Sequence, residues 1–266
     1  MSWRVDPADL EAVGAAAATP DLLKSWASFG LGPRLASVAE HVPAGEITAD
    51  VGADHAHLLA ALLERERIPG GWVVEINQAP LNAARATISK RALNARTEFR
   101  LGDGFQPLSQ ATDLLQVPSC ACLCGVGGHL AARLLRAAPQ SLSRIIFQVN
   151  HGHGALRSAL CEEGWLIVDR SLVLERGRLF LNLVAARTSE AVEASAINTL
   201  SSAPHPLLEV NELLEGERLA PLWARTLQRR LRHRLMQSPH EASRASLREA
   251  LAFLEKSALI GLPMFP

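Results

Sequence analysis

The feature that most constrains the fold of this chain is a regular alternation of short apolar runs with amphipathic segments between residues 34 and 186. The apolar runs, which we interpret as strands, cover 47–52, 72–77, 97–101, 120–124, 144–148, 165–169 and 179–186. Helical spacing fills most intervals, at 34–41, 55–65, 80–92, 129–137 and 155–163. Such alternation favours a mostly parallel sheet covered on both faces, and the last two runs, joined without a helix, predict an antiparallel edge. The expected fold class is therefore α/β, with a Rossmann-like seven-stranded sheet.

Shorter segments flank this region on both sides. Residues 1–30 contain helical patches and are expected to form an N-terminal helical extension, whereas the predicted domain itself spans 31–188. A linker containing Ser, Thr, Ala and Pro is expected at 189–206. Within 207–266, a leucine stripe over 219–235 and a capping box at 238–241 predict two helices that form an antiparallel hairpin.

Composition excludes several classes of protein. The chain is 48% hydrophobic and carries 27 basic and 27 acidic residues, which is incompatible with a disordered chain. No apolar run approaches the roughly 20 residues that span a bilayer, so we expect no membrane partner. Three of the four cysteines, Cys120, Cys122 and Cys124, lie in one strand-like run, whereas a disulfide framework would scatter them. We therefore expect a reduced, cytoplasmic protein.

Three strand ends carry residues that suit a nucleoside. Gly52 stands where the first strand turns into a helix, so a ligand can approach the backbone and the N–H groups of the helix terminus. Glu75 ends the second strand, where it is placed for a bidentate grip on ribose hydroxyls. Asp103 follows the third strand, where it can accept a hydrogen bond from an adenine amino group. Because ligands of open α/β sheets lie outside the carboxyl ends of the strands, these residues outline one crevice.

The turn after the first strand separates two classes of cofactor. A dinucleotide calls for G-x-G-x-x-G at this turn, but Gly52 is followed by Asp54 and His55, with no second or third glycine. The Asp54 carboxylate would repel a pyrophosphate, whereas a sulfonium cofactor with an ammonium group tolerates it. A seven-stranded sheet of this order is also the commonest scaffold for methyl transfer from S-adenosylmethionine, although a fold alone does not prove an activity. Charge therefore favours a methyltransferase.

Five motifs, taken as a set, resemble the TrmK family of bacterial tRNA (adenine-N1)-methyltransferases. They are DVGADHAHL at 50–58, EIN at 75–77, RLGDG at 100–104, GVGG at 125–128 and QVN at 148–150. The similarity runs from about Arg34 to Ala186, and the expected C-terminal hairpin resembles the helical appendage of that family. The resemblance implies a class I methyltransferase that uses S-adenosylmethionine to methylate N1 of an adenine in the D-loop of tRNA.

The motifs and the resemblance together define the expected site. The cofactor-binding residues are Asp50, Gly52, Asp54, His55, Glu75, Ile76, Asp103, Gly104, Cys124 and Gly125. The substrate-binding residues are Val126, Gly127, Gly128, His129, Gln148, Asn150, Arg225, Arg229 and Arg232. Two residues are expected to act on the base: the Asp54 carboxylate could stabilise a cationic product or help remove an N6 proton, and Asn150 offers a donor and an acceptor. Alignment of the N1 lone pair with the methyl group should supply most of the acceleration.

An arginine-rich helix is expected to contact the RNA. Six arginines and no carboxylate lie between Arg218 and His240. Of these arginines, Arg225, Arg229 and Arg232 lie roughly opposite the leucine stripe, on a face that could grip phosphates. The alternative is a solvated helix whose charge offsets the acidic segment before it. Attachment to this domain favours the contact with RNA.

Three positions depart from the pattern of the family: His57 replaces a tyrosine, Val126 a methionine and Val149 a proline. The last two are expected to face the target base. The alternatives are therefore an N-methyltransferase for another base or a small molecule, or a catalytically degenerate RNA-binding homologue. The cysteine run and His151-Gly152-His153 lack the spacing of a zinc site, so we expect no metal. We expect a monomer whose partner is tRNA.

Overall fold

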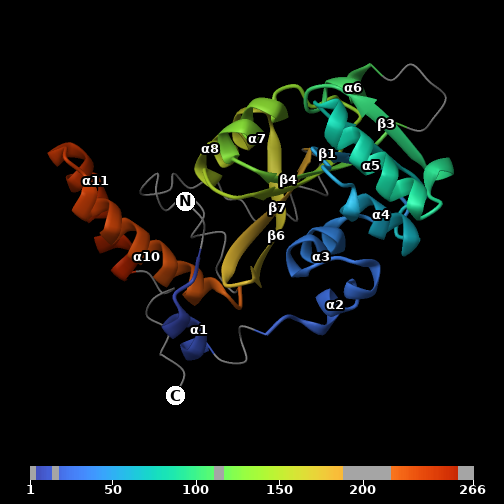
Figure 1. Cartoon of the computed structure of the whole chain (residues 1–266). Helices are drawn as coiled ribbons and strands as arrows, with labels where there is room; N and C mark the ends of the chain where they lie inside the picture. Colours follow the sequence, from blue (N-terminus) through green and yellow to red (C-terminus); the bar gives the residue numbers. More distant parts are fainter. Residues whose placement is uncertain (1–3, 14–17, 111–116, 188–216, 257–266) are drawn as a thin grey trace.

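A seven-stranded sheet forms the centre of the computed structural model, which describes residues 4–13, 18–110, 117–187 and 217–256 (Figure 1). The strands are β1 (Thr48–Val51), β2 (Gly71–Glu75), β3 (Thr97–Leu101), β4 (Cys120–Val126), β5 (Arg144–Val149), β6 (Trp165–Glu175) and β7 (Arg178–Arg187). Their order is β3-β2-β1-β4-β5-β7-β6. The first five pair in parallel, and β7 is antiparallel to both β5 and β6. The predicted sheet and its antiparallel edge are confirmed.

Helices cover both faces of this sheet. In chain order they are α1 (Pro7–Val13), α2 (Asp21–Lys24), η2 (Ala27–Phe29), α3 (Pro33–His41), α4 (His57–Glu64), α5 (Gln78–Lys90), η3 (Asn94–Arg96), α6 (Gln106–Ser109), α7 (Gly128–Leu135), α8 (His153–Glu162), α10 (Ala220–Gln237) and α11 (Glu241–Lys256). Successive residues of β5 show how the two layers arise: Ile146 joins the core under α3, α4 and α5, whereas Phe147 joins the core under α7, α8 and α10. No helix within these described ranges is long and apolar enough to cross a membrane.

The strand β6 is longer than the sequence predicts, because it ends at Glu175 and not at Asp169. Its second half pairs with the first half of β7, and the tip of this hairpin is at Glu175 and Arg178. Since β5 ends at Val149, opposite Leu181, the tip projects beyond the carboxyl end of β5. In the middle of β6, three consecutive polar residues, Asp169, Arg170 and Ser171, interrupt the apolar signal that defined the shorter run.

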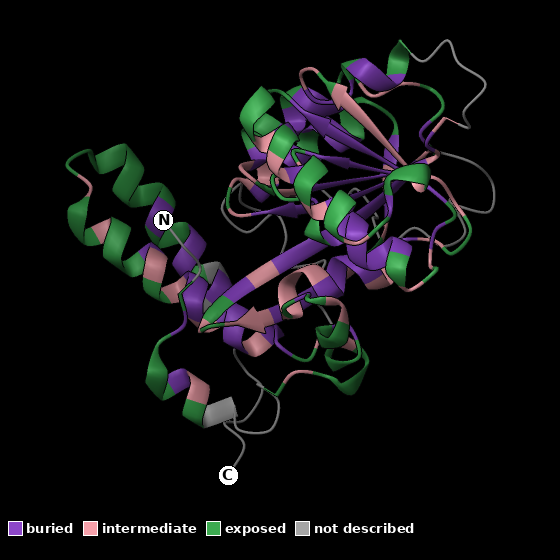
Figure 2. Cartoon of the chain, turned by 45° about the vertical axis from the view of Figure 1, so that its right-hand side comes forward, coloured by how far each residue is buried: buried purple, intermediate pink, exposed green. Residues whose placement is uncertain are grey.

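The helices α10 and α11 pack against each other as the predicted hairpin. The first turns of α10 belong to the same hydrophobic cluster as the sheet. Trp223 is fully buried there, and its ring meets the His153 ring of α8 edge-on at a centroid distance of 5.4 Å. The distal parts of both helices stand away from the sheet and are largely exposed (Figure 2). The hairpin is therefore anchored through its base; the expected linker at 189–206 lies outside the described residues.

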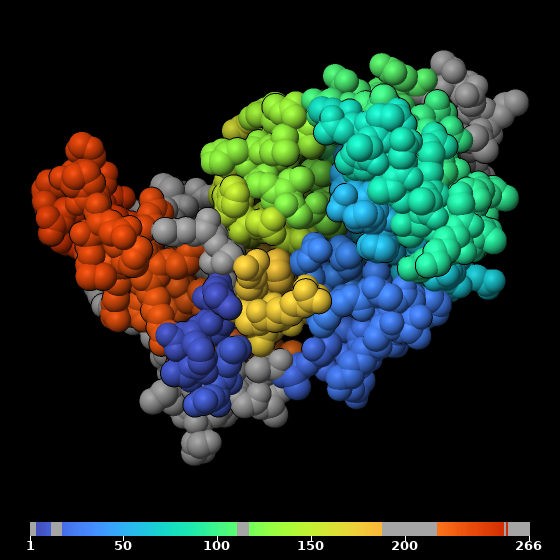
Figure 3. All heavy atoms as spheres, viewed as in Figure 1, coloured from blue at the N-terminus to red at the C-terminus, as the bar shows by residue number. Residues whose placement is uncertain are grey.

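The N-terminal extension divides into two parts that pack in different places. Arg4 forms a β-bridge with Arg178, and the Val5 N–H donates to the Gly177 carbonyl at 2.8 Å. The chain then enters α1, which contacts α10 (Figure 3). In contrast, α2 and η2 lie near α3, where the buried Trp26 indole donates to Glu40. The beginning and end of the described chain thus meet beside the β6–β7 tip.

Candidate functional site

The candidate site lies where the strand order reverses. β1 pairs with β2 on one side and with β4 on the other. The chain adds β2 and β3 on the first side of β1 and then returns to add β4 and β5 on the second side. Such a switch point leaves a crevice outside the carboxyl ends of the strands, where open α/β sheets bind ligands. The predicted cofactor motifs at 50–55, 75–76 and 124–125 all fall at this edge.

Two glycines mark the mouth of the crevice. Gly52 follows β1 with a φ of +70°, and Gly125 lies near the end of β4 with a φ of +79°. A Cβ added to either residue would meet no protein atom within 4 Å, so the space beside each backbone is open. Glycine adopts this left-handed conformation without steric cost. Both strand ends can therefore receive a ligand directly against the backbone.

The turn between β1 and α4 holds two further residues in the left-handed region. Asp54 has a φ of +51° and Ala56 a φ of +53°. Such conformations cost about 1–3 kcal/mol each for residues other than glycine, and they concentrate at functional sites. They delay the start of α4 to His57, although the sequence predicts a helix from His55. The side chains of Asp54 and His55 are 74% and 54% exposed, so this turn presents them to solvent.

Glu75 ties this turn to the neighbouring strand. Its carboxylate is buried at the end of β2, and Oε1 accepts a hydrogen bond from the backbone N–H of Asp54. The second carboxylate oxygen gives it the capacity to accept a bond from a ligand hydroxyl. Asp50 lies deeper, and burial, together with the charge of Glu75, raises the pKa of its carboxyl to about 7. Asp50, a predicted cofactor contact, is therefore buried behind the site.

Apolar and charged groups meet at the ends of β2 and β3. Ile76 and Leu101 are 56% and 53% exposed, an arrangement that could cover a flat ring. Asp103 forms an ion pair with Arg133 at 2.9 Å, and this hydrogen bond lowers the pKa of its carboxyl. Gly104 packs closely, since a Cβ there would overlap a side chain of α7. Leu101 and Arg133 are not among the predicted site residues: Leu101 belongs to the RLGDG motif but lies in an ordinary strand pattern, and Arg133 comes from another element.

The glycine-rich loop after β4 packs tightly against the loop after β5. A Cβ at Gly127 would press on the His151 ring, and one at Gly128 would overlap the Gly152 carbonyl. The Gly128 N–H donates to the His151 carbonyl at 2.7 Å. His129, at the start of α7, is exposed. These glycines therefore join two loops at the mouth of the crevice.

A chain of hydrogen bonds, which we call the amide relay, orients Asn150. Nη1 of Arg34 in α3 donates to Oε1 of Gln148 at 2.7 Å, and Nε2 of Gln148 donates to Oδ1 of Asn150 at 3.2 Å. Nδ2 of Asn150 then donates to the Gly125 carbonyl at 2.6 Å. Because a guanidinium can only donate, Arg34 dictates which way both amides point. Sequence analysis missed Arg34, whose partner Gln148 lies 114 residues away.

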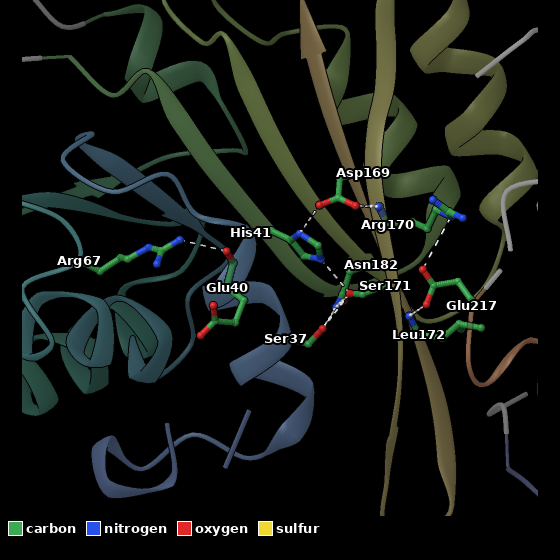
Figure 4. Close-up of polar contacts among 10 residues, drawn as sticks. All are labelled: Ser37, Glu40, His41, Arg67, Asp169, Arg170, Ser171, Leu172, Asn182 and Glu217. Atoms are coloured by element: carbon green, nitrogen blue, oxygen red, sulfur yellow. Dashed lines mark hydrogen bonds and ion pairs between the residues drawn. The ribbon is translucent and has the colours of Figure 1, made fainter. Parts of the chain in front are cut away.

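A polar network holds α3 against the edge of the sheet (Figure 4). Nδ1 of His41 lies 3.1 Å from Oδ2 of Asp169, and Nε2 lies 2.8 Å from the Ser171 hydroxyl. Asn182 donates to the hydroxyls of Ser37 and Ser171 at 2.8 and 3.1 Å. The hydrogen bond from His41 lowers the pKa of the Asp169 carboxyl. This network ties the helix that begins the amide relay to β6 and β7.

Two of the departures from the family pattern lie in or against the core. Val149 is 1% exposed, and Val126 is partly buried and packs against the same core cluster. The expectation that residue 149 faces a base is therefore wrong, because the alternation of β5 turns this side chain inward. The third departure, His57, is exposed and stacks on His55 at 5.6 Å.

The arginine face of α10 is partly neutralised. Nη1 of Arg225 lies 3.8 Å from a carboxylate oxygen of Asp9. Nη1 of Arg229 lies 2.5 Å from Asp6 and 3.2 Å from Asp9. The two arginines, which are predicted to contact RNA, thus already pair with carboxylates from the N-terminal segment. Arg232 is exposed on the distal part of the helix.

Two cysteines of β4 and one histidine of α8 are buried. Cys120 and Cys122 are buried in β4, and burial raises the pKa of the Cys120 thiol to about 12. Cys124 lies partly buried at the carboxyl end of the strand. Burial lowers the pKa of the His153 ring to about 4. Among the residues that the structure describes, no three His, Cys, Asp or Glu side chains are grouped to hold a metal ion.

Comparison with protein families and curated proteins gives matches in the same region. A family described as a methyltransferase domain matches residues 31–183. A tRNA (adenine(22)-N(1))-methyltransferase from Bacillus subtilis is 30% identical over 158 residues, which is 58% of this chain and 64% of that protein. The chain thus matches slightly less than two thirds of the length of this relative.

Solved structures have the same fold. The crystal structure of the B. subtilis m1A22 tRNA methyltransferase TrmK has a TM-score of 0.68 at 25% identity, covering 87% of this chain and 99% of that chain. M. capricolum TrmK, solved in complex with S-adenosyl-homocysteine, has a TM-score of 0.72 at 20% identity, covering 85% and 96%. These shares exceed the span 31–183, so the likeness includes elements outside the matched domain.

Proposed function

Because the chain belongs to the methyltransferase-domain family, we propose that it transfers a methyl group from S-adenosylmethionine to N1 of an adenine in the D-loop of tRNA, in the cytoplasm. The observation that carries the proposal is the pair Gly52 and Gly125, left-handed residues at the ends of adjacent strands, each beside open space. The neighbouring Glu75 carboxylate suits the ribose of a nucleoside. The relatives named above as tRNA adenine methyltransferases support the same chemistry.

The residues around the crevice fit this cofactor, which supplies an electrophilic methyl group on a sulfonium. Glu75 would accept hydrogen bonds from the ribose hydroxyls, and the exposed Ile76 and Leu101 would cover the purine ring. Gly52 and Gly125 would allow close approach of the backbone. The Asp54 carboxylate adds negative charge at the turn, which favours a cationic ligand over a pyrophosphate.

The target base would be held by Asn150. The amide relay leaves this amide with a further lone pair and a second N–H, a combination that can pair with an adenine edge. Holding N1 in line with the methyl group supplies the rate enhancement that comes from proximity and orientation. The exposed Asp54 would then hold the N6 proton or stabilise the positive charge that develops on the base.

The RNA would extend from the crevice toward the C-terminal hairpin. Exposed arginines on the distal part of α10, including Arg232 and Arg234, provide positive charge for backbone phosphates. Arg225 and Arg229 would contribute less, because Asp6 and Asp9 already pair with them.

A labelling experiment tests the proposal. The purified chain is incubated with S-adenosylmethionine carrying a labelled methyl group and with total tRNA from a strain that lacks this protein. The labelled nucleosides are then mapped, and we expect N1-methyladenosine in the D-loop. Label on another base would indicate an N-methyltransferase with a different target base. Binding of cofactor and tRNA without any transfer would indicate a degenerate homologue and overturn the proposal.

A further inference from the structure

A cavity of about 520 Å³ lies between the N-terminal segment and α10, apart from the strand-end site. Residues 4–7 form one wall, and one face of α10 forms the other (Figure 3). The polar and charged residues of its lining are Arg4, Asp6, Thr226, Arg229, Arg230 and His233. The N-terminal wall precedes residue 31, where the family match begins, so this cavity is not part of the shared domain.

The lining carries a surplus of positive charge. It contains the guanidinium groups of Arg4, Arg229 and Arg230 but only one carboxylate, that of Asp6. The Arg229 guanidinium is already paired with Asp6 at 2.5 Å and with Asp9, which lies outside the lining, at 3.2 Å. Burial, and then the charge of Arg234, lower the pKa of the Arg230 guanidinium. A bound anion would offset this excess of positive charge in the cavity lining.

The cavity lies beside the same end of the sheet as the crevice. Arg4 bridges to Arg178 at the β6–β7 tip, which projects beyond the end of β5. The carboxyl ends of β1, β4 and β5, which form the crevice, point toward this same side because the three strands are parallel. A long substrate that enters the crevice can therefore pass the cavity.

We propose that this cavity binds a backbone phosphate of the RNA together with its ribose, as a second contact with the substrate. The inference rests on the proposed function. Arginine forks match phosphate oxygens in a bidentate geometry. The volume falls within the roughly 300–1,000 Å³ that is usual for ligand sites, which suits a nucleotide unit better than a bare ion.

Substitution of Arg4 in the full chain tests this site. Its side chain is exposed and it joins the sheet through a backbone bridge, so Arg4→Ala and Arg4→Glu should fold. We expect Arg4→Ala to weaken tRNA binding by about 3- to 10-fold, and to make the slope of log affinity against log salt shallower by about 0.7–0.9. Arg4→Glu should weaken binding further. For both variants, the KM for tRNA should rise while kcat and cofactor affinity stay constant.

The matched control is Arg248→Ala, which removes one arginine from α11, outside the cavity. Equal losses in Arg4→Ala and Arg248→Ala would reveal a general charge effect and overturn the site. Unchanged tRNA affinity in both Arg4 variants of a chain that still methylates tRNA would overturn the site and leave the proposed function standing. A parent chain that neither binds nor methylates tRNA would contradict the proposed function itself.

A free nucleotide could supply the same phosphate and ribose to the cavity, so we use AMP as the probe for this alternative. The parent chain and Arg4→Glu are titrated with AMP by calorimetry. AMP binding that disappears in Arg4→Glu, with tRNA affinity unchanged, would assign the cavity to a small nucleotide and overturn the RNA contact. Competition between AMP and tRNA that requires Arg4 supports the proposal.

Discussion

The carboxyl edge of the sheet and the surface of α10 both carry short motifs of charged residues, but the fold treats the two motifs differently. At the edge, Gly52 and Asp54 share one turn, and Glu75 of the adjacent strand accepts a hydrogen bond from that turn. On α10, Arg225 and Arg229 meet carboxylates from the N-terminal segment. The motif at the edge gains a hydrogen-bond partner from the adjacent strand, whereas the positive charge on α10 is partly neutralised by carboxylates from a segment far away in the sequence.

This difference reflects how each region is constrained. Parallel strands bring their carboxyl ends to one edge whatever their side chains are, so a polar residue after each strand predicts a common site. Any other segment of the chain can cover a face of a surface helix. Burial also differs: groups at the edge lie near or below the surface, whereas α10 is exposed over its distal part. Substitutions at the edge should therefore have the larger effects.

The largest effect is expected at Glu75. Glu75→Ala removes a buried carboxylate that would bind two ribose hydroxyls and that holds the turn at Asp54. We expect cofactor affinity to fall by about 100-fold, since hydrogen bonds to a charged group contribute about 1.5–3 kcal/mol. Calorimetric titration with S-adenosyl-homocysteine measures this loss of affinity. Glu75→Gln keeps the volume and should lose less. Affinity within threefold of the parent in Glu75→Ala would remove the ribose contact from this strand end.

A pH dependence of stability is the next largest effect. Folding raises the pKa of Asp50 from 3.8 to about 7, so the folded state holds the proton more tightly than the unfolded state. The stability from this group is present below pH 3.8 and is lost as the pH rises to about 7. We expect the unfolding free energy of the parent, relative to Asp50→Asn, to fall steadily as the pH rises across this range. Urea unfolding of both proteins at several pH values measures the difference. If the unfolding free energies of the parent and of Asp50→Asn changed in parallel with pH, the raised pKa of the buried Asp50 carboxyl would be contradicted.

The amide relay should show a smaller effect that is confined to turnover. Asn150→Ala should lower kcat by about 5-fold, because one neutral hydrogen bond to the base contributes about 1 kcal/mol. Arg34→Met keeps the apolar stem but loses the donor that orients Gln148, so we expect a loss of a few-fold. Cofactor affinity should stay within twofold for both variants. A rise in KM with kcat unchanged would place the relay in substrate binding alone, and full activity in Asn150→Ala would move the base contact to another residue.

The smallest effect is expected on the α10 surface. Asp9→Asn removes the carboxylate that Arg225 and Arg229 share and leaves Arg229 paired with Asp6 alone, so tRNA affinity should rise by about two- to fivefold at low salt. Stability should fall as well, because the Asp9 carboxylate is buried and pairs with two arginines. Glu11→Gln on the same helix is the control, because it changes the net charge equally at an exposed position. Weaker tRNA binding in Asp9→Asn would show that the carboxylate organises these arginines for RNA.

The seven-stranded, mostly parallel sheet with its antiparallel edge and the TrmK resemblance follow from the sequence and are confirmed by the structure and the comparisons. Errors arise where local patterns are weak. The helix α4 begins at His57 because Asp54 and Ala56 adopt left-handed conformations, which no residue type there signals. Sequence analysis misses the end of β6 because a block of polar residues at 169–171 interrupts the apolar pattern. The predicted roles of the site residues remain predictions.

The sequence by itself determined the features that depend on neighbours along the chain. These are the alternation of strands and helices, the glycine after β1, and the carboxylate at the end of β2. Tertiary structure alone decided the rest: the burial of Val149, the amide relay from Arg34, the pairing of Arg229 with Asp6 and the cavity beside it. The physical reason is the range of each interaction. Periodicity and turn conformation act over a few residues, whereas burial and ion pairing are set by segments that meet only after the chain has folded.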